Sequence, residues 1–199
     1  NFFRTVDFWR MLAVSVGAAV IRVLGHLVVA ALAGYAFARF RFPGRNVLFI
    51  AFLAMLMVPG QLFLINQFQL MQSLRLLNTV PALAIPGIFT AFGTFLMRQS
   101  FSMLPADYED SARIDGANRF QTFWHVMLPL AGPSLAALAV LTGVFSWNDL
   151  LWPLIVTQDP DRMPLSVGLA GLQGQYGTDY PTLMAGSLIS WIIIFRKAR

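Results

Sequence analysis

The sequence contains no cysteine, only two histidines and a single lysine, and only 12% of its 199 residues are charged. Without cysteine, the chain has no disulfide, iron–sulfur cluster or thiol nucleophile. His26 and His125 lie far apart, and neither belongs to an HExxH pattern or a carboxylate cluster, so we interpret both as structural or interfacial and expect no metal site. Lys197 is not part of a GxxxxGK[ST] phosphate loop, so any ATP that the protein uses must be hydrolysed by another chain.

The remaining composition is that of an integral membrane protein. Hydrophobic residues make up 57% of the chain and the mean hydropathy is +0.66, whereas about a quarter of the residues of a soluble domain are charged. We therefore expect an all-α, polytopic helical membrane protein with five visible transmembrane helices in one domain, residues 1–199. The apolar stretches are Met11 to Ala38, Val47 to Leu64, Ala82 to Met97, Leu130 to Ile155 and Leu183 to Phe195.

A helix needs about 20 mostly apolar residues to cross the hydrocarbon core of a membrane. The first and fourth stretches are long enough by themselves. The second and third are interrupted by Pro59-Gly60 and Pro86-Gly87, which a membrane helix tolerates where its neighbours satisfy the backbone. The fifth stretch is short, and we expect it to be incomplete.

The basic residues predict the orientation. If the loop at residues 39–45, the polar segment after residue 104 and the C-terminal tail share one side, that side has nine basic residues and the other has four. The nine are Arg39, Arg41, Arg45, Arg98, Arg113, Arg119, Arg196, Lys197 and Arg199, and the four are Arg4, Arg10, Arg75 and Arg162. The positive-inside rule places the nine in the cytoplasm. No basic patch is interleaved with aromatics, so nucleic acid is not an expected partner.

The polar segment, residues 105–133, is bounded by prolines and separates two apolar stretches. Pro105 suits the first turn of a helix, and acidic residues follow it where the helix dipole favours them. Gly116 is the residue most able to adopt the left-handed conformation that ends a helix. The pattern predicts a short helix, a turn at Asp115 to Ala117, and a second amphipathic helix that ends before Pro129.

This segment resembles the EAA loop of the permease subunits of bacterial ABC importers. That loop has the pattern Glu-Ala-Ala, three residues, Gly, nine residues, then Ile-x-Leu-Pro. The chain has Asp110-Ser111-Ala112, Gly116 and Val126-Met127-Leu128-Pro129 at the same spacing. The form ARIDGA and two flanking stretches, AGYAFARFRFPGR and FSWNDLLWPLIV, are similar to the carbohydrate-import, maltose-type branch.

The resemblance implies that residues 105–129 form a cytoplasmic coupling loop in a bacterial-type inner membrane, with the C-terminal end also cytoplasmic and a sixth helix before the first one seen. The coupling residues it implies are Tyr108, Glu109, Asp110, Ser111, Ala112, Arg113, Asp115, Gly116 and Ala117. It also implies two ATP-binding subunits, a second homologous permease, an extracytoplasmic solute-binding protein and membrane lipid as partners. This chain itself would bind no cofactor, with ATP and Mg on the ATPase. On capping chemistry alone, an ordinary connecting loop is an alternative.

Polar residues inside an apolar stretch are candidates for a solute path, because they are costly to bury in a membrane. Trp147, Asn148 and Asp149 interrupt the fourth stretch, and Trp152 follows one turn later. Amide and carboxylate groups can hydrogen-bond to sugar hydroxyls, and aromatic rings can stack on a pyranose. Alternatively, these four residues fix helix packing.

Residues 157–181 form a second polar segment, which we expect to be an outer loop near the docking surface of the solute-binding protein or a plain connection. The predicted function is that of a permease subunit for a sugar or sugar-like solute. Rival predictions are the same machinery with a polyol, glycerol phosphate or another small solute, a membrane-embedded enzyme, or an ion-driven carrier that works alone.

Overall fold

The computed structural model describes residues 8–171, 173–174, 177–178 and 184, and these are largely helical. The α-helices are α2 (Phe8–Arg39), α3 (Arg45–Ala54), α4 (Leu64–Ser73), α5 (Val80–Ala84), α6 (Ala91–Met103), α7 (Asp107–Ile114), α8 (Arg119–Thr122), α9 (Leu128–Leu130), α10 (Gly132–Asn148), α11 (Leu151–Val156) and α12 (Leu165–Gly171). Short 3₁₀ turns are η1 (Met55–Met57), η2 (Gly60–Phe63), η3 (Ile85–Gly87) and η5 (Pro160–Arg162), and η4 (Phe123–Met127) is a π turn. Strands β1 (Gln173–Gly174) and β2 (Gly177–Thr178) pair antiparallel.

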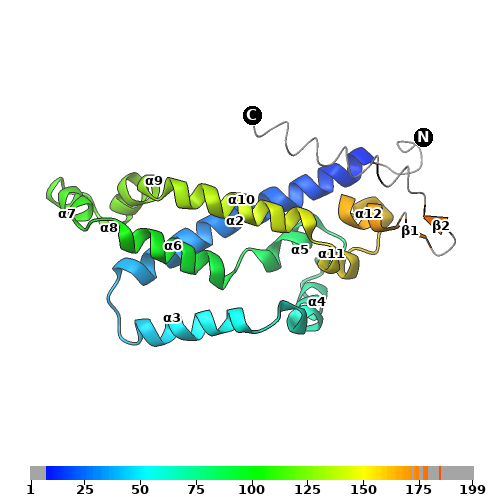
Figure 1. Cartoon of the computed structure of the whole chain (residues 1–199), viewed down its shortest axis with the longest axis horizontal. Coiled ribbons are helices and arrows are strands. Elements are labelled where there is room, and N and C mark those ends of the chain that lie inside the picture. Colours follow the sequence, from blue (N-terminus) through cyan, green and yellow to red (C-terminus); the bar gives the residue numbers. More distant parts are fainter. Residues whose placement is uncertain (1–7, 172, 175–176, 179–183, 185–199) are drawn as a thin grey trace.

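The long helix α2 is the centre of the molecule, with α6 and α10 alongside it (Figure 1). Along α2, the residues that face the bundle recur at every fourth position, a spacing that places side chains above one another on a helix. Ala18, Arg22, His26, Ala30 and Gly34 make up this face, which is turned into the bundle. At Gly34 an added Cβ would lie 2.5 Å from the Cβ of Met97, so the α2–α6 crossing requires glycine.

Among the described residues, α2 is the one continuous helix long and apolar enough to cross a membrane. The predicted first span is therefore confirmed as a helix. Three further candidates are bent pairs: Arg45–Met57 with Gly60–Ser73 at 96°, Val80–Gly87 with Ala91–Met103 at 53°, and Arg119–Leu130 with Gly132–Asn148 at 73°. The first two bends lie next to Pro59-Gly60 and Pro86-Gly87, as the sequence predicts. Except for Met184, the fifth apolar stretch lies outside the described residues, as does the C-terminal tail.

The prediction of a single span from Leu130 to Ile155 is wrong. Helix α10 ends at Asn148, the backbone of Asp149 is extended with ψ 119°, and α11 begins at Leu151. The Asp149 carboxylate explains the break, because its Oδ1 accepts the N–H of Trp152 at 3.4 Å and so caps the next helix. Polar side chains at helix starts replace the backbone bonds that a continuous helix would make.

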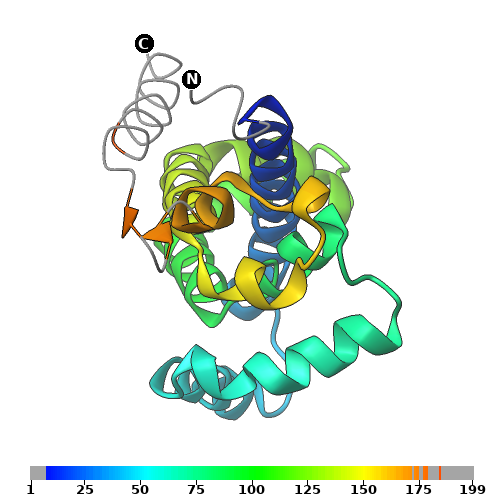
Figure 2. The same ribbon diagram turned by 90° about the vertical axis from the view of Figure 1, so that its right-hand side faces the viewer.

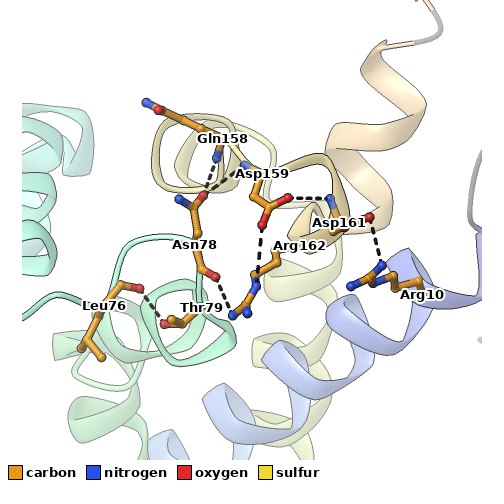
Figure 3. A network of polar contacts seen from close by, with 8 residues as sticks. All are labelled: Arg10, Leu76, Asn78, Thr79, Gln158, Asp159, Asp161 and Arg162. Atoms are coloured by element: carbon orange, nitrogen blue, oxygen red, sulfur yellow. Dashed lines mark hydrogen bonds and ion pairs between the residues drawn. The ribbon is translucent and has the colours of Figure 1, made fainter.

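The first part of residues 157–181, for which an outer loop or a plain connection was predicted, contains η5 and the helix α12. Helix α12 packs Leu165 against Phe8 of α2, in an apolar cluster that Trp147 also contacts. Figure 3 shows how neighbouring segments are tied together there. Asn78, in the left-handed conformation with φ 59°, accepts the backbone N–H groups of Gln158 at 2.7 Å and Asp159 at 3.1 Å on its side-chain oxygen.

Ion pairs extend the network of Figure 3. Arg162 donates to the carbonyl of Asn78 at 3.2 Å and lies 3.8 Å from the carboxylate of Asp159. Asp161 pairs with Arg10 of α2 at 2.9 Å. The segment after α11 is thus fastened to the α4–α5 connection and to the beginning of α2.

Besides the cluster of Phe8 and Leu165, the apolar core has two larger clusters. At the α7 end, Tyr35 packs with Phe101 and Phe123, at ring-centroid distances of 5.4 and 5.0 Å. At the α12 end, the second cluster contains Ala18, Met71, Ala82, Leu83, Trp152 and Val156. Arg22 and His26 lie between the two clusters along α2. Helices α3 and α4 lie on the outside of the bundle (Figures 1 and 2) and contact it through Phe49 and Met71.

Candidate functional site

Helix α7, the predicted coupling helix, begins slightly later than the sequence suggested. Its first turn closes when Glu109 and Asp110 donate their backbone N–H groups to the carbonyl of Ala106, at 2.9 and 3.1 Å. Pro105 therefore lies before α7 and not within its first turn. Asp107, Glu109 and Asp110 still occupy that turn, where the helix dipole favours negative charge.

The turn after α7 has the geometry expected from Gly116, whose φ is 85°. Gly116 donates its N–H to Arg113 O at 3.0 Å, and Ala117 donates to Ala112 O at 2.9 Å, which together form a Schellman C-cap. Asn118 then begins α8 with a capping box, in which its side chain and that of Gln121 bond to each other's backbone N–H at 2.9 Å. Two caps in sequence fix the direction in which α7 and α8 leave the turn.

The prediction that the second helix ends before Pro129 is wrong. Helix α8 continues through the π turn Phe123–Met127 into α9, which contains Pro129 and ends at Leu130. Leu128 donates its N–H to Phe123 O, five residues earlier, so the helix is widened at the turn before the proline. Such a local adjustment lets a helix accept a residue that has no N–H to donate.

Glu109, one of the expected coupling residues, is buried and does not lie on the exposed face of α7. Its side chain is only 10% exposed and lies 3.4 Å from Nε of Arg39, the last residue of α2, whose side chain is 15% exposed. Arg39 also donates to Leu104 O, just before α7, at 2.6 Å. The Tyr35 hydroxyl interacts with the same Glu109 carboxylate. Glu109 therefore anchors α7 to the end of α2.

The other expected coupling residues divide by exposure. Asp110, Ser111, Arg113, Asp115, Gly116 and Tyr108 are exposed, whereas Ala112 is buried and Ala117 half-buried. Asp110 and Arg113 pair across one turn at 3.4 Å. The sequence reasoning missed Ile114 and Phe120, apolar side chains that are 86% and 66% exposed on either side of the turn. A large apolar residue at the polar end of α7 was the signal that could have identified Ile114.

A second candidate site is a cavity of about 610 Å³ between α2, α6 and α10. Its lining residues are Arg22, His26, Gly87, Thr90, Phe92, Leu138, Leu141, Thr142, Phe145, Asn148 and Asp149. Small-molecule sites in proteins usually have volumes of about 300–1,000 Å³. Two of the four predicted path residues, Asn148 and Asp149, line this cavity.

Arg22 of α2 and Asp149 at the α10–α11 break form an ion pair across the cavity, with 3.0 Å between Nη1 and Oδ2. Their side chains are 18% and 24% exposed. Gly87 provides room for this guanidinium, because an added Cβ would lie 1.8 Å from Nε of Arg22. Nothing near Arg22 in the sequence indicates this partner, because Asp149 is 127 positions away.

His26 connects three helical segments through two threonines. Its Nδ1 lies 2.8 Å from Thr142 Oγ1, and its Nε2 lies 2.7 Å from Thr90 Oγ1. Thr142 already donates its hydroxyl to Leu138 O at 2.8 Å, so it must accept from Nδ1–H, and Thr90 donates to Nε2. His26 is thus a hydrogen-bonded structural histidine, as predicted, and a neutral imidazole can satisfy both of these bonds. Among the described residues, no three His, Cys, Asp or Glu side chains are grouped as metal ligands would be.

Trp147 and Trp152 lie outside the cavity. Trp147 packs against the cluster of Phe8 and Leu165, and Trp152 is 6% exposed with its indole N–H donated to Ala82 O at 2.9 Å. Both tryptophans therefore have the packing role that was the alternative interpretation.

Comparison with known proteins decides the family. Residues 26–196 match the model of the binding-protein-dependent transport system inner membrane component family. The chain belongs to this permease family. It is a transport permease component and not an enzyme, and the described apolar helices agree with the membrane location that the family description gives.

Several relatives of this permease have assigned transport roles. It is 41% identical over 187 residues to the arabinooligosaccharides transport system permease protein AraQ of Halalkalibacterium halodurans. The aligned residues make up 94% of this chain and 67% of that one. It is 35% identical over 190 residues to the sn-glycerol-3-phosphate transport system permease protein UgpE of Shigella flexneri. That alignment covers 94% of this chain and 68% of the relative. The permease thus spans about two thirds of the length of these relatives.

Among solved structures, the permease is similar to a chain of a bacterial ABC transporter involved in the import of the acidic polysaccharide alginate. The TM-score is 0.78 and the sequence identity 29%, over 92% of this chain and 64% of that one. The resemblance that the polar segment suggested is therefore confirmed at the level of family and fold.

Proposed function

We propose that this permease is a subunit of an ATP-driven ABC importer for a sugar or sugar-like solute, and that α7 with its C-terminal turn docks on a separate ATPase. The observation that supports this most directly is the division of α7 into two faces. Glu109 and Ala112 are buried against the permease, whereas Asp110, Arg113 and Ile114 face outward. A short helix that is anchored on one face and free on the other can transmit the closure of an ATPase to α2 as a rigid-body movement.

The proposed orientation places the α7 end in the cytoplasm. Arg39, Arg41, Arg45, Arg98, Arg113 and Arg119 belong to segments at this end, whereas Arg10 and Arg162 take part in the network at the α12 end. An excess of arginine on one side indicates the cytoplasmic side. An ATPase, with its ATP and Mg, would then reach α7, and this chain would bind neither.

The remaining partners follow from the proposed importer. A second homologous permease and lipid would cover the exposed apolar side chains of α3 and η1, such as Val47 and Met57, which are 72% and 86% exposed. An extracytoplasmic solute-binding protein would dock at the α12 end, near residues 157–181. The cavity that Asn148 and Asp149 line would form this subunit's half of the solute path. A polyol or glycerol phosphate is the alternative cargo, since one relative is a glycerol-3-phosphate permease.

The test of coupling is co-purification in detergent with the ATPase subunit encoded beside this permease. Ile114→Ala should lower ATPase recovery at least fivefold, because apolar side chains at the centre of a docking surface carry much of the binding energy. Ile65→Ala is the matched control, because it is the same substitution at an isoleucine that is 71% exposed but lies on α4, outside the α7–α8 turn. Equal recovery with both variants, or no ATPase recovery with the intact folded chain, would rule out α7 as the docking helix.

A further inference from the structure

We propose that the cavity between α2, α6 and α10 is a subsite for an uncharged, polyhydroxylated part of the solute and discriminates against anionic solutes. This inference rests on the proposed function and narrows its substrate class. It matters because the relatives named above differ in this respect: arabinooligosaccharides are neutral, whereas glycerol 3-phosphate and alginate are anionic.

The position of the cavity suits a solute that crosses the membrane. Arg22 and His26 lie near the midpoint of α2, between the two apolar clusters. The break between α10 and α11 is at Asp149, on the wall of the same cavity. Non-helical backbone at membrane depth is tolerated where it is buried in protein or lines a cavity, and transporters place their solute sites at such broken helices.

The ionisable groups of the cavity compensate one another. Arg22 and Asp149 are the charged residues of its lining, and their 3.0 Å ion pair cancels one positive charge with one negative charge. Both ring nitrogens of His26 are engaged by threonine hydroxyls, a pattern that an uncharged imidazole satisfies. An anionic solute close to this pair would meet the Asp149 carboxylate as well as the Arg22 guanidinium, so repulsion from Asp149 offsets the attraction of Arg22.

The remaining polar and aromatic side chains of the cavity are of the kinds that bind sugar hydroxyls and the apolar faces of sugar rings. Asn148 uses an amide N–H to bond Val144 O at 2.9 Å, so its amide oxygen can still accept a hydroxyl proton. Phe92 and Phe145 are 41% and 67% exposed on the cavity wall and offer aromatic faces to the apolar side of a sugar ring. Neutral polar acceptors combined with aromatic faces fit an uncharged carbohydrate.

Because the chain has no cysteine, a single introduced thiol reports on the cavity directly. Phe145→Cys places the thiol on the cavity wall, and Val140→Cys is the matched control on the same helix, since both positions are 67% exposed and Val140 does not line the cavity. Each variant is assembled with its partner subunits in an otherwise cysteine-free complex. Labelling by N-ethylmaleimide is then timed with arabinotriose, maltotriose, sn-glycerol 3-phosphate or an alginate trisaccharide.

We expect at least one neutral sugar to slow labelling at position 145 threefold or more, no protection by the two anionic solutes, and no effect of any solute at position 140. Protection at position 145 by an anionic solute alone, or by both classes equally, would overturn the charge argument. A complex that transports one of these solutes without protection at position 145 would overturn the subsite but leave the proposed function intact. A complex that neither binds an ATPase nor transports any of them would refute the proposed function itself.

Asp149→Asn adds a test that does not depend on which neutral sugar is the true cargo. Asparagine keeps the side-chain oxygen that accepts the Trp152 N–H but removes the charge that compensates Arg22. In the Phe145→Cys background, this variant should gain at least threefold protection by glycerol 3-phosphate or alginate trisaccharide. If the variant complex elutes as an intact assembly and still shows no protection by an anion, charge compensation does not set the selectivity of the cavity.

Discussion

Two ion pairs of α7 have the same length, but one is buried and joins α7 to α2 whereas the other is exposed and lies within α7, so comparing them tests how this helix is anchored. Arg39–Glu109 and Arg113–Asp110 both have a nitrogen–oxygen distance of 3.4 Å. The side chains of the first pair are 15% and 10% exposed, and those of the second are 56% and 64% exposed. Glu109→Gln and Asp110→Asn each remove one negative charge with little change of shape.

The expected magnitudes follow from burial. At 3.4 Å and an effective dielectric constant of about 20, the attraction between two unit charges is about 5 kcal/mol before desolvation is subtracted. Because Glu109→Gln leaves the buried Arg39 without its counter-ion, we expect a loss of about 2–3 kcal/mol of stability. The exposed Asp110 pair is screened by solvent, so Asp110→Asn should change stability by less than about 0.5 kcal/mol.

The assay is thermal unfolding of the purified permease in detergent, in parallel with ATPase recovery. Glu109→Gln should lower the melting temperature by about 5–10 °C, since about 1 kcal/mol corresponds to 2–4 °C in a chain of this size. Asp110→Asn should leave the melting temperature within about 1–2 °C but lower ATPase recovery, because Asp110 is on the exposed face. Equal melting temperatures for the two variants would refute the claim that Glu109 anchors α7 to α2.

Three further substitutions test other parts of the structure. Gly116→Ala should destabilise the permease by about 1–2 kcal/mol, because φ is 85° at this glycine. Gly132→Ala is the control and should not destabilise it, because Gly132 has no positive φ, and the melting temperatures of the two variants test both expectations. Trp152→Phe should lower stability by about 1–2 kcal/mol, because it leaves the buried carbonyl of Ala82 unpaired, yet transport assays should show unchanged solute preference. Asn78→Ala should speed tryptic cleavage of the segment after α11 at least threefold in limited proteolysis, because two backbone N–H groups lose their acceptor; an unchanged digestion rate would show that Asn78 does not fasten that segment.

The parts of the fold that depend on local chemistry could be predicted from the sequence. Gly116 ends α7 because a left-handed turn needs glycine, and the bends next to Pro59-Gly60 and Pro86-Gly87 reflect the missing N–H of proline. These features depend on residues within a few positions of one another. The break at Asp149 is also local. It was missed because one capping carboxylate within a long apolar stretch does not change the prediction of a continuous helix.

The parts that depend on distant partners could not be predicted. Glu109 was expected among the coupling residues, and nothing near it in sequence reveals that it pairs with Arg39, 70 positions earlier, and faces inward. Arg22 had no identifiable partner for the same reason. The helix Leu165–Gly171 was missed because its apolar side chains face Phe8, at the far end of the chain. Tertiary contacts, and not local propensity, decide these positions.

Helix α3 has one buried residue, Phe49, which packs on Phe37 and Phe95 at 5.4 and 6.4 Å and lies 3.9 Å beneath the guanidinium of Arg98. Exposing one buried phenylalanine side chain costs about 1.5–3 kcal/mol. A state with α3 detached is therefore occupied by about one isolated molecule in ten to one in a hundred, since each 1.4 kcal/mol is a factor of ten. Amide exchange in α3 would thus proceed by this opening, while α2 and α6 keep their protons until the whole bundle unfolds.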